Sequence, residues 1–158
     1  MENQPLITEE KEAPRKKPRR FFLNAVIYLA IVLGLVLGMP RFLSWALHTP
    51  YPMAAITSGS MWPVLKEGDL VFIQGILKEE IEVGDVIVYQ NGARGGFTIH
   101  RVVELNETTL VTKGDANFTE DAPVEYENVV GRTLSLFGKY VRIPRLGSIT
   151  VFANNLRK

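Results

Sequence analysis

An uncharged apolar run near the N-terminus constrains this chain more than any other feature. It extends from Phe21 to Met39, 19 consecutive residues without a charged side chain. As a helix rising about 1.5 Å per residue it would be roughly 28 Å long, close to the ~30 Å hydrocarbon core of a bilayer. The alternatives are a buried core helix, which the rest of the chain is too short to surround, and a cleavable signal peptide. The run predicts a single transmembrane helix over residues 21–40.

Basic residues gather on one side of this predicted span. Five of the six residues at 15–20 are Lys or Arg, whereas only Arg41 lies just after it. By the positive-inside rule, the N-terminus stays in the cytoplasm and the body lies on the other side of the lipid bilayer. We therefore expect a disordered cytoplasmic tail over 1–20, an interfacial linker over 41–53 and an extracytoplasmic domain over 54–158.

Composition excludes several kinds of site. The net charge is +1, from 18 basic and 17 acidic residues, so the basic face that a nucleic-acid partner requires is not expected. There is no cysteine and there are only two histidines, His48 and His100. Thiol nucleophiles, disulfide scaffolds and multi-histidine metal sites are therefore excluded, and we expect neither a metal nor a cofactor.

The pattern of residues 54–158 predicts a mainly β structure. Short β-branched runs alternate with turn signals such as Gly68-Asp69, Gly84-Asp85 and Gly114-Asp115. No helical period of useful length appears between residues 54 and 138. We expect a curled, barrel-like antiparallel sheet. The predicted strands are Ala54–Ser58, Leu70–Gln74, Val86–Gln90, Thr98–Glu104, Thr109–Lys113 and Val129–Phe137.

Three segments carry residues suited to nucleophilic catalysis. Ser58 and Ser60 flank Gly59 at the end of a strand, where a tight backbone path would expose Ser60 and direct its amide at a carbonyl. A serine-rich turn is the simpler interpretation of this spacing. His100 is the one histidine of the body, and a neutral imidazole can accept a serine proton. A structural histidine is the usual alternative.

The third segment is an acidic loop that follows a strand. It contains Asp115, Glu120 and Asp121, and one of these carboxylates could orient His100 as the acid of a triad does. An ordinary acidic surface loop is the alternative. A serine, a histidine and an acid in this chain order make a membrane-tethered serine hydrolase one interpretation among several.

The motifs together resemble those of type I signal peptidases. The string SGSMWP with EGDLVFIQG is similar to the nucleophile region of that family, and GDVIVY, IHRVVE and TKGDAN resemble its later motifs in the same order. The resemblance covers roughly residues 55–135. Bacterial members usually place a lysine at the base position, whereas this chain has His100. The chain therefore resembles the endoplasmic-reticulum and archaeal branch, which uses a Ser-His-Asp triad.

The resemblance implies a role for each matching residue. Ser60 corresponds to the nucleophile and His100 to the general base. Asp121 is preferred to Asp115 as the triad acid, and Asp115 corresponds to a supporting residue. Ser58 matches a hydroxyl that helps to hold the oxyanion. Three further positions match the pocket for the residue before the cut: Ile56, Met61 and Ile99.

These matches imply a function, with two rivals. The expected activity is removal of signal peptides from secreted preproteins by a membrane-bound serine endopeptidase, through an acyl-enzyme, with accessory subunits as further candidate partners. A prokaryotic cell membrane is favoured over the endoplasmic reticulum. One rival is a self-cleaving Ser-Lys peptidase, against which the span and His100 argue. The other is a catalytically silent, membrane-anchored peptide-recognition module.

Overall fold

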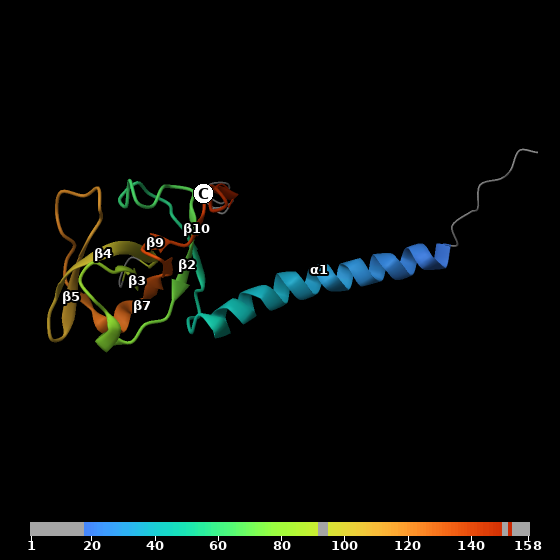
Figure 1. The fold of residues 1–158 in the computed structure, drawn as a ribbon, viewed down its shortest axis with the longest axis horizontal. Helices are drawn as coiled ribbons and strands as arrows, with labels where there is room; N and C mark the ends of the chain where they lie inside the picture. The colour runs from blue at the N-terminus through green and yellow to red at the C-terminus, as the bar shows by residue number, and fades with distance from the viewer. Residues whose placement is uncertain (1–17, 92–94, 150–151, 153–158) are drawn as a thin grey trace, which may run out of the picture. The chain divides into compact units, whose positions relative to one another are not determined.

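The computed structural model describes residues 18–91, 95–149 and 152. Most of the N-terminal tail expected over 1–20 lies outside these residues. The chain divides into two compact units, one ending at Met39 and one from Pro40 to Lys158. Figure 1 traces both units along the chain.

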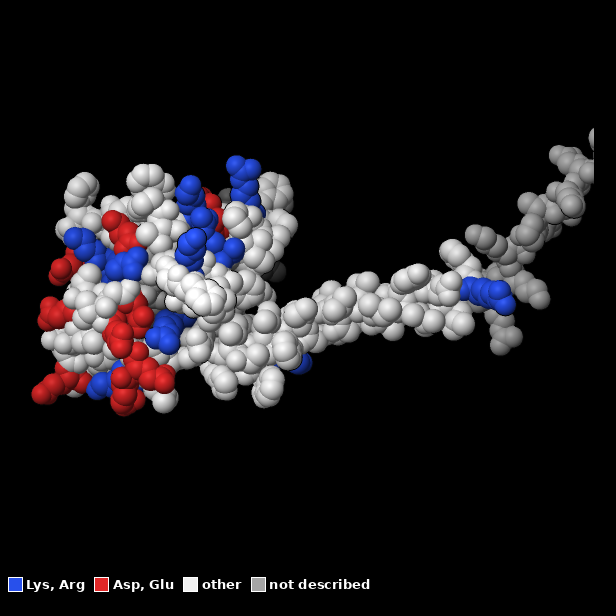
Figure 2. All heavy atoms as spheres, in the orientation of Figure 1, with Lys and Arg blue, Asp and Glu red and all other residues white. Residues whose placement is uncertain are grey.

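The N-terminal unit contains most of one long helix, α1, from Pro18 to Ala46. Proline suits the first position of a helix, because the N–H that it lacks has no helical partner there. By length and composition, the segment from Arg20 to Ala46 is long and apolar enough to cross a membrane. Its most apolar stretch of 18 residues has a mean hydropathy of 2.5, and none of that stretch is buried. Figure 2 shows most of the visible face of α1 free of charged side chains. The helix is longer than the apolar run at both ends, so residues 41–46 of the expected linker are helical.

The C-terminal unit is a curled antiparallel sheet, as predicted. Its main sheet has the order β1-β2-β7-β3-β4-β5-β6, with β10 also paired to β2, and β8 and β9 form a separate ribbon. Two short 3₁₀ helices, η1 (Lys78–Glu80) and η3 (Tyr126–Asn128), lie between strands. The strands are β1 Met53–Ala55, β2 Leu70–Gln74, β3 Val86–Gln90, β4 Phe97–Leu105, β5 Thr109–Lys113, β6 Val124–Glu125, β7 Val129–Thr133, β8 Ser135–Leu136, β9 Lys139–Tyr140 and β10 Arg142–Ile143.

Two predicted strands differ substantially from those observed, and β4 extends one residue beyond its predicted bounds at each end. The strand expected over Ala54–Ser58 ends at Ala55 as β1, although the Ile56 amide still donates to the Asp69 carbonyl. The strand expected over Val129–Phe137 divides into β7 and β8. It ends in a tight turn at Phe137 and Gly138, both with positive φ, which is the backbone of a two-residue hairpin.

Two apolar clusters form the core of this unit. One gathers Ile87, Tyr89, Val102 and Leu110 from the central strands. The other is built from Ile56, Met61, Leu65, Val71 and Val86. Full burial of side chains of this size stabilises a fold by about 1.5–3 kcal/mol each. The second cluster fixes Met61, which lies next to Ser60, so the core also positions the serine loop.

Two strand edges remain unpaired where the sheet curls. Among the described residues, β1 pairs only with β2. In β4, residues 97–100 pair with β3 on one side, while pairing with β5 begins only at Arg101. A cavity lies between these two edges. The backbone groups that face it are therefore available to an added strand.

Candidate active site

Ser60 lies in the loop that leaves β1. Its carbonyl accepts the amide of Ala116 at 2.8 Å, so the acidic loop is joined to the serine loop. Met61 is buried immediately after it, and the Trp62 amide closes a turn onto the Gly59 carbonyl at 3.0 Å. Gly59 itself has neither a positive φ nor an atom close to where a Cβ would stand. The tight backbone path expected here therefore does not depend on the conformational freedom of glycine.

His100 projects from β4 toward this serine. Its side chain is nearly buried, and its Nε2 lies 3.1 Å from Ser60 Oγ. Its Nδ1 lies 2.5 Å from the Asp121 carboxylate. A carboxylate can only accept, so Nδ1 carries the proton and Nε2 is left as an acceptor for the Ser60 hydroxyl. This tautomer is the one that a general base requires.

Asp121 is held in an irregular segment after β5. Its amide donates to the Thr112 carbonyl at 2.8 Å, which places the carboxylate beside His100. The same carboxylate oxygen lies 2.7 Å from the Thr112 hydroxyl and 3.3 Å from the Tyr89 hydroxyl. Burial raises the pKa of Tyr89 above its ordinary value, so the phenol stays protonated and able to donate.

Asp115 lies in a different environment. It accepts two hydrogen bonds from the Arg101 guanidinium, at 2.8 and 2.7 Å. This pairing raises the pKa of Arg101 above its ordinary value, so the guanidinium remains charged. Arg101 also donates to the Gly84 carbonyl and to the Tyr140 hydroxyl. Asp115 thus belongs to an ion pair that joins strands, while the structure brings Asp121 to His100.

Ser58 stands beside the nucleophile. Its Oγ lies 3.1 Å from Ser60 Oγ. Because the Ser60 proton points to His100, Ser58 is the donor of this hydrogen bond. A second hydroxyl donor next to a nucleophilic oxygen is suitably placed to hold an oxyanion, together with the Ser60 amide.

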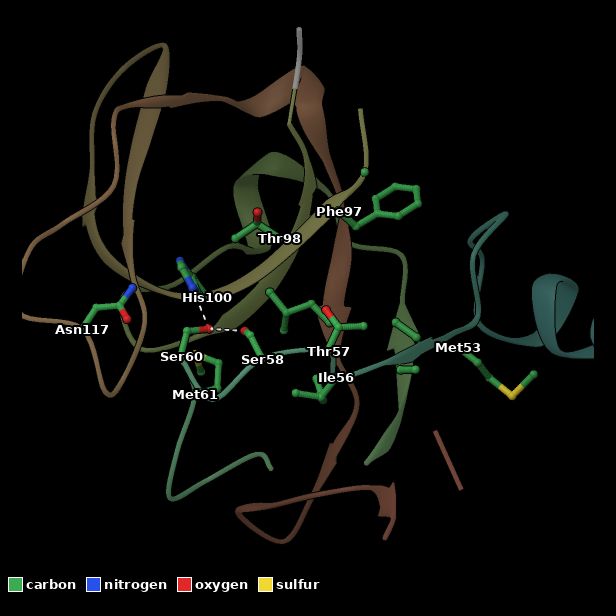
Figure 3. Close-up of a pocket in the computed structure, with 14 residues that line it drawn as sticks. Met53, Ile56, Thr57, Ser58, Ser60, Met61, Phe97, Thr98, His100 and Asn117 are labelled. Carbon is green, nitrogen blue, oxygen red and sulfur yellow. Dashed lines mark hydrogen bonds between the residues drawn. The ribbon is translucent and has the colours of Figure 1, made fainter. Parts of the chain in front are cut away.

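A groove of about 710 Å³ runs along these residues. Figure 3 shows Ser58, Ser60 and His100 at one end and Met53 and Phe97 at the other. The three residues expected to form a substrate pocket all line it: Ile56, Met61 and Ile99. Ile56 and Met61 are buried, so they form the floor of the groove and do not project into it. Among the described residues, no group of three His, Cys, Asp or Glu side chains is placed to hold a metal ion.

Thr112 and Tyr89 were not predicted as site residues. Tyr89 is a buried residue of β3, and Thr112 is a buried residue of β5. Side chains on the buried face of a strand are ordinarily apolar. A polar hydroxyl on the buried face of each strand was the signal that could have singled them out.

Comparisons with known proteins point to one family. The chain is 30% identical over 139 residues to the signal peptidase complex catalytic subunit sec11 of Sclerotinia sclerotiorum, covering 80% of this chain and 77% of the relative. It is 26% identical over 157 residues to the catalytic subunit SEC11C of Canis lupus familiaris, covering 91% and 79%. It is 27% identical over 139 residues to SEC11 of Pyricularia oryzae. No family model matches the chain. These relatives are eukaryotic and give no support to the expected prokaryotic membrane.

Proposed function

The chain belongs to the family of signal peptidase complex catalytic subunits, and from this premise we propose that it is a membrane-anchored serine endopeptidase that removes signal peptides from secreted preproteins. The observation that carries the proposal is the continuous line of hydrogen bonds from Ser60 through His100 to Asp121. A serine hydroxyl is a weak nucleophile until an adjacent base accepts its proton.

The reaction proceeds through an acyl-enzyme. Ser60 Oγ attacks the scissile carbonyl while His100 Nε2 accepts its proton, and Asp121 stabilises the imidazolium that forms. The Ser60 amide and the Ser58 hydroxyl hold the oxyanion. His100 then gives its proton to the leaving amine, which departs with the mature protein. Water, activated by His100, hydrolyses the ester and releases the signal peptide.

The substrate binds as an added strand in the groove. The unpaired edges of β1 and of residues 97–100 of β4 face the groove, so a peptide between them can form backbone hydrogen bonds on both sides. Alternate side chains of an extended peptide point the same way. Those of the residue before the cut and its second neighbour upstream would therefore face the floor of Ile56, Met61 and Ile99, which favours small side chains.

The Arg20–Ala46 segment supplies the anchor, and it determines on which side the enzyme works. Tethering raises the effective concentration of the enzyme near substrates that are already in the bilayer. With the basic cluster in the cytoplasm, residues 54–158 lie on the far side. The relatives' names describe subunits of a complex, which supports accessory subunits as partners here.

Protease added to the extracytoplasmic face of sealed membranes should digest the body and leave the tail intact. The physical reason is the excess of Lys and Arg before the span. Epitope tags at the two ends of the chain, followed by immunoblotting, provide the measurement, and detergent-opened membranes are the control for tag accessibility. Digestion of the N-terminal tag with protection of the C-terminal one would reverse the orientation and remove the substrates from reach.

The function is tested by incubating the purified full-length protein with a secretory preprotein. Wild type should release one mature product whose new N-terminus follows a small-x-small sequence, while Ser60→Ala should release none. The matched control is the same preprotein with arginine at the residue before the cut, because a long charged side chain does not fit the apolar floor of the groove. Cleavage by Ser60→Ala, or equal cleavage of both preproteins, would contradict the proposal.

A further inference from the structure

We infer that Thr112 is the positioning residue of the active site, its buried hydroxyl holding the Asp121 carboxylate in the orientation that His100 needs. This inference rests on the proposed function. Thr112 lies in β5 opposite Val102, and its side chain is 0% exposed. Its hydroxyl is 2.7 Å from Asp121 Oδ2, the oxygen that also accepts His100 Nδ1–H.

Proton counting assigns the direction of these bonds. A threonine hydroxyl carries one proton, and Asp121 lies closer to it than Tyr89 does, at 2.7 against 3.3 Å. Thr112 therefore donates to the carboxylate. The Tyr89 phenol, also 3.3 Å from that carboxylate, supplies a second, weaker donor. Both donors meet the same charged acceptor, so the shorter Thr112 contact is the stronger of the two.

The carboxylate needs this donor because its own backbone does not lie in a strand. Asp121 falls in the irregular segment between β5 and β6, and its side chain is 24% exposed. The bond from its amide to the Thr112 carbonyl fixes the main chain but leaves the carboxylate free to rotate toward water. The Thr112 hydroxyl, fixed in a fully buried strand position, opposes that rotation. Thr112 thus acts on Ser60 only through Asp121 and His100.

The test compares Thr112→Val with Thr112→Ser, because valine keeps the shape and removes the hydroxyl while serine keeps the hydroxyl. Thr133→Val is the matched control: Thr133 is also buried, and its hydroxyl donates to the Val86 carbonyl at 3.0 Å. We expect Thr112→Val to lower kcat by about ten- to a hundredfold at unchanged KM. Thr112→Ser should recover most of kcat. Thr133→Val should lower the melting temperature about as much as Thr112→Val does, but it should leave kcat unchanged.

Two further measurements separate positioning from stability. In the Asp121→Asn background, Thr112→Val should cost almost nothing more, because the group it orients is gone. The rate at which a fluorophosphonate labels Ser60 should fall in parallel with kcat. This rate depends on Ser60 activation and not on the preprotein, so it remains informative if wild type fails to cleave the preprotein and the proposed function falls.

Three results would overturn the positioning role. These are a Thr112→Val kcat equal to that of Thr133→Val, an undiminished labelling rate, and a full additional loss in the Asp121→Asn background. Should Thr112→Val not fold, Thr112→Ala and Thr112→Ser provide the same comparison, because they differ only by the hydroxyl.

Discussion

Ser60→Ala and His100→Ala should each lower kcat by about 10⁶-fold, and the double variant should lower it no further. The two side chains act as one unit, since the proton that leaves Ser60 Oγ goes to an Nε2 atom 3.1 Å away. Without His100, Ser60 has no base to accept its proton. Without Ser60, His100 has no nucleophile to activate. The measurement is single-turnover cleavage of a preprotein by each purified variant, with thermal unfolding to establish that each is folded. Two losses that simply multiply would mean that the residues work independently, and the triad would be wrong.

His100→Lys is the informative companion to these variants. A lysine can accept a proton only when neutral, and an anion beside it favours its charged form. The Asp121 carboxylate, 2.5 Å from Nδ1 in the wild-type protein, would be that anion. We therefore expect no more activity than in His100→Ala. Activity within tenfold of wild type would show that the site accepts either base. The resemblance to the histidine branch would then say nothing about the mechanism.

Asp121→Asn should lower kcat by about 10⁴-fold with little change in KM, if the behaviour of serine proteases transfers. An asparagine amide cannot stabilise the imidazolium and favours the wrong tautomer of His100. Asp115→Asn should instead leave kcat largely intact and lower the free energy of unfolding by about 1–3 kcal/mol, because the NH2 group that replaces one carboxylate oxygen cannot accept from Arg101 and the charge of the pair is lost.

Each of these two variants is the control for the other. Both replace one carboxylate of the same loop by its isosteric amide, so general damage to the loop would affect them alike. The measurements are kcat and KM on one preprotein, and chemical unfolding of both proteins. If Asp115→Asn abolished turnover at unchanged stability while Asp121→Asn resembled wild type, the two assignments would be exchanged.

The sequence predicted the longer strands well and missed three of the four two-residue strands. Predicted bounds agree residue for residue with β2, β3 and β5, which contain β-branched residues and are each flanked by a Gly-Asp turn. β6, β9 and β10 were missed. Each is two residues long, too short to display a period of two. They exist because of tertiary pairing, as when Arg142 meets Val71 across the β10–β2 register.

The kind of site could be predicted from the residues, but the preference for Asp121 as the acid came from the family resemblance alone. Ser60 and His100 could be singled out because the body has one histidine and one Ser-Gly-Ser corner. Between Asp115 and Asp121, spacing alone could not decide. In the structure, Arg101 forms an ion pair with Asp115, and the Thr112 carbonyl accepts the Asp121 amide. These two contacts place Asp121, and not Asp115, beside His100. Arg101 and Thr112 lie on strands whose lateral register no local pattern reveals.

The two unpaired edges that border the groove impose a rule on what can be cut. A peptide bonded to both β1 and residues 97–100 of β4 occupies the place of a central strand. Central strands exclude proline, which has no N–H to give and whose ring obstructs pairing. Secretory precursors would thus be sorted by backbone as well as by side-chain size. One with a proline among the paired residues before the cut would keep its leader, whatever small residues it displayed.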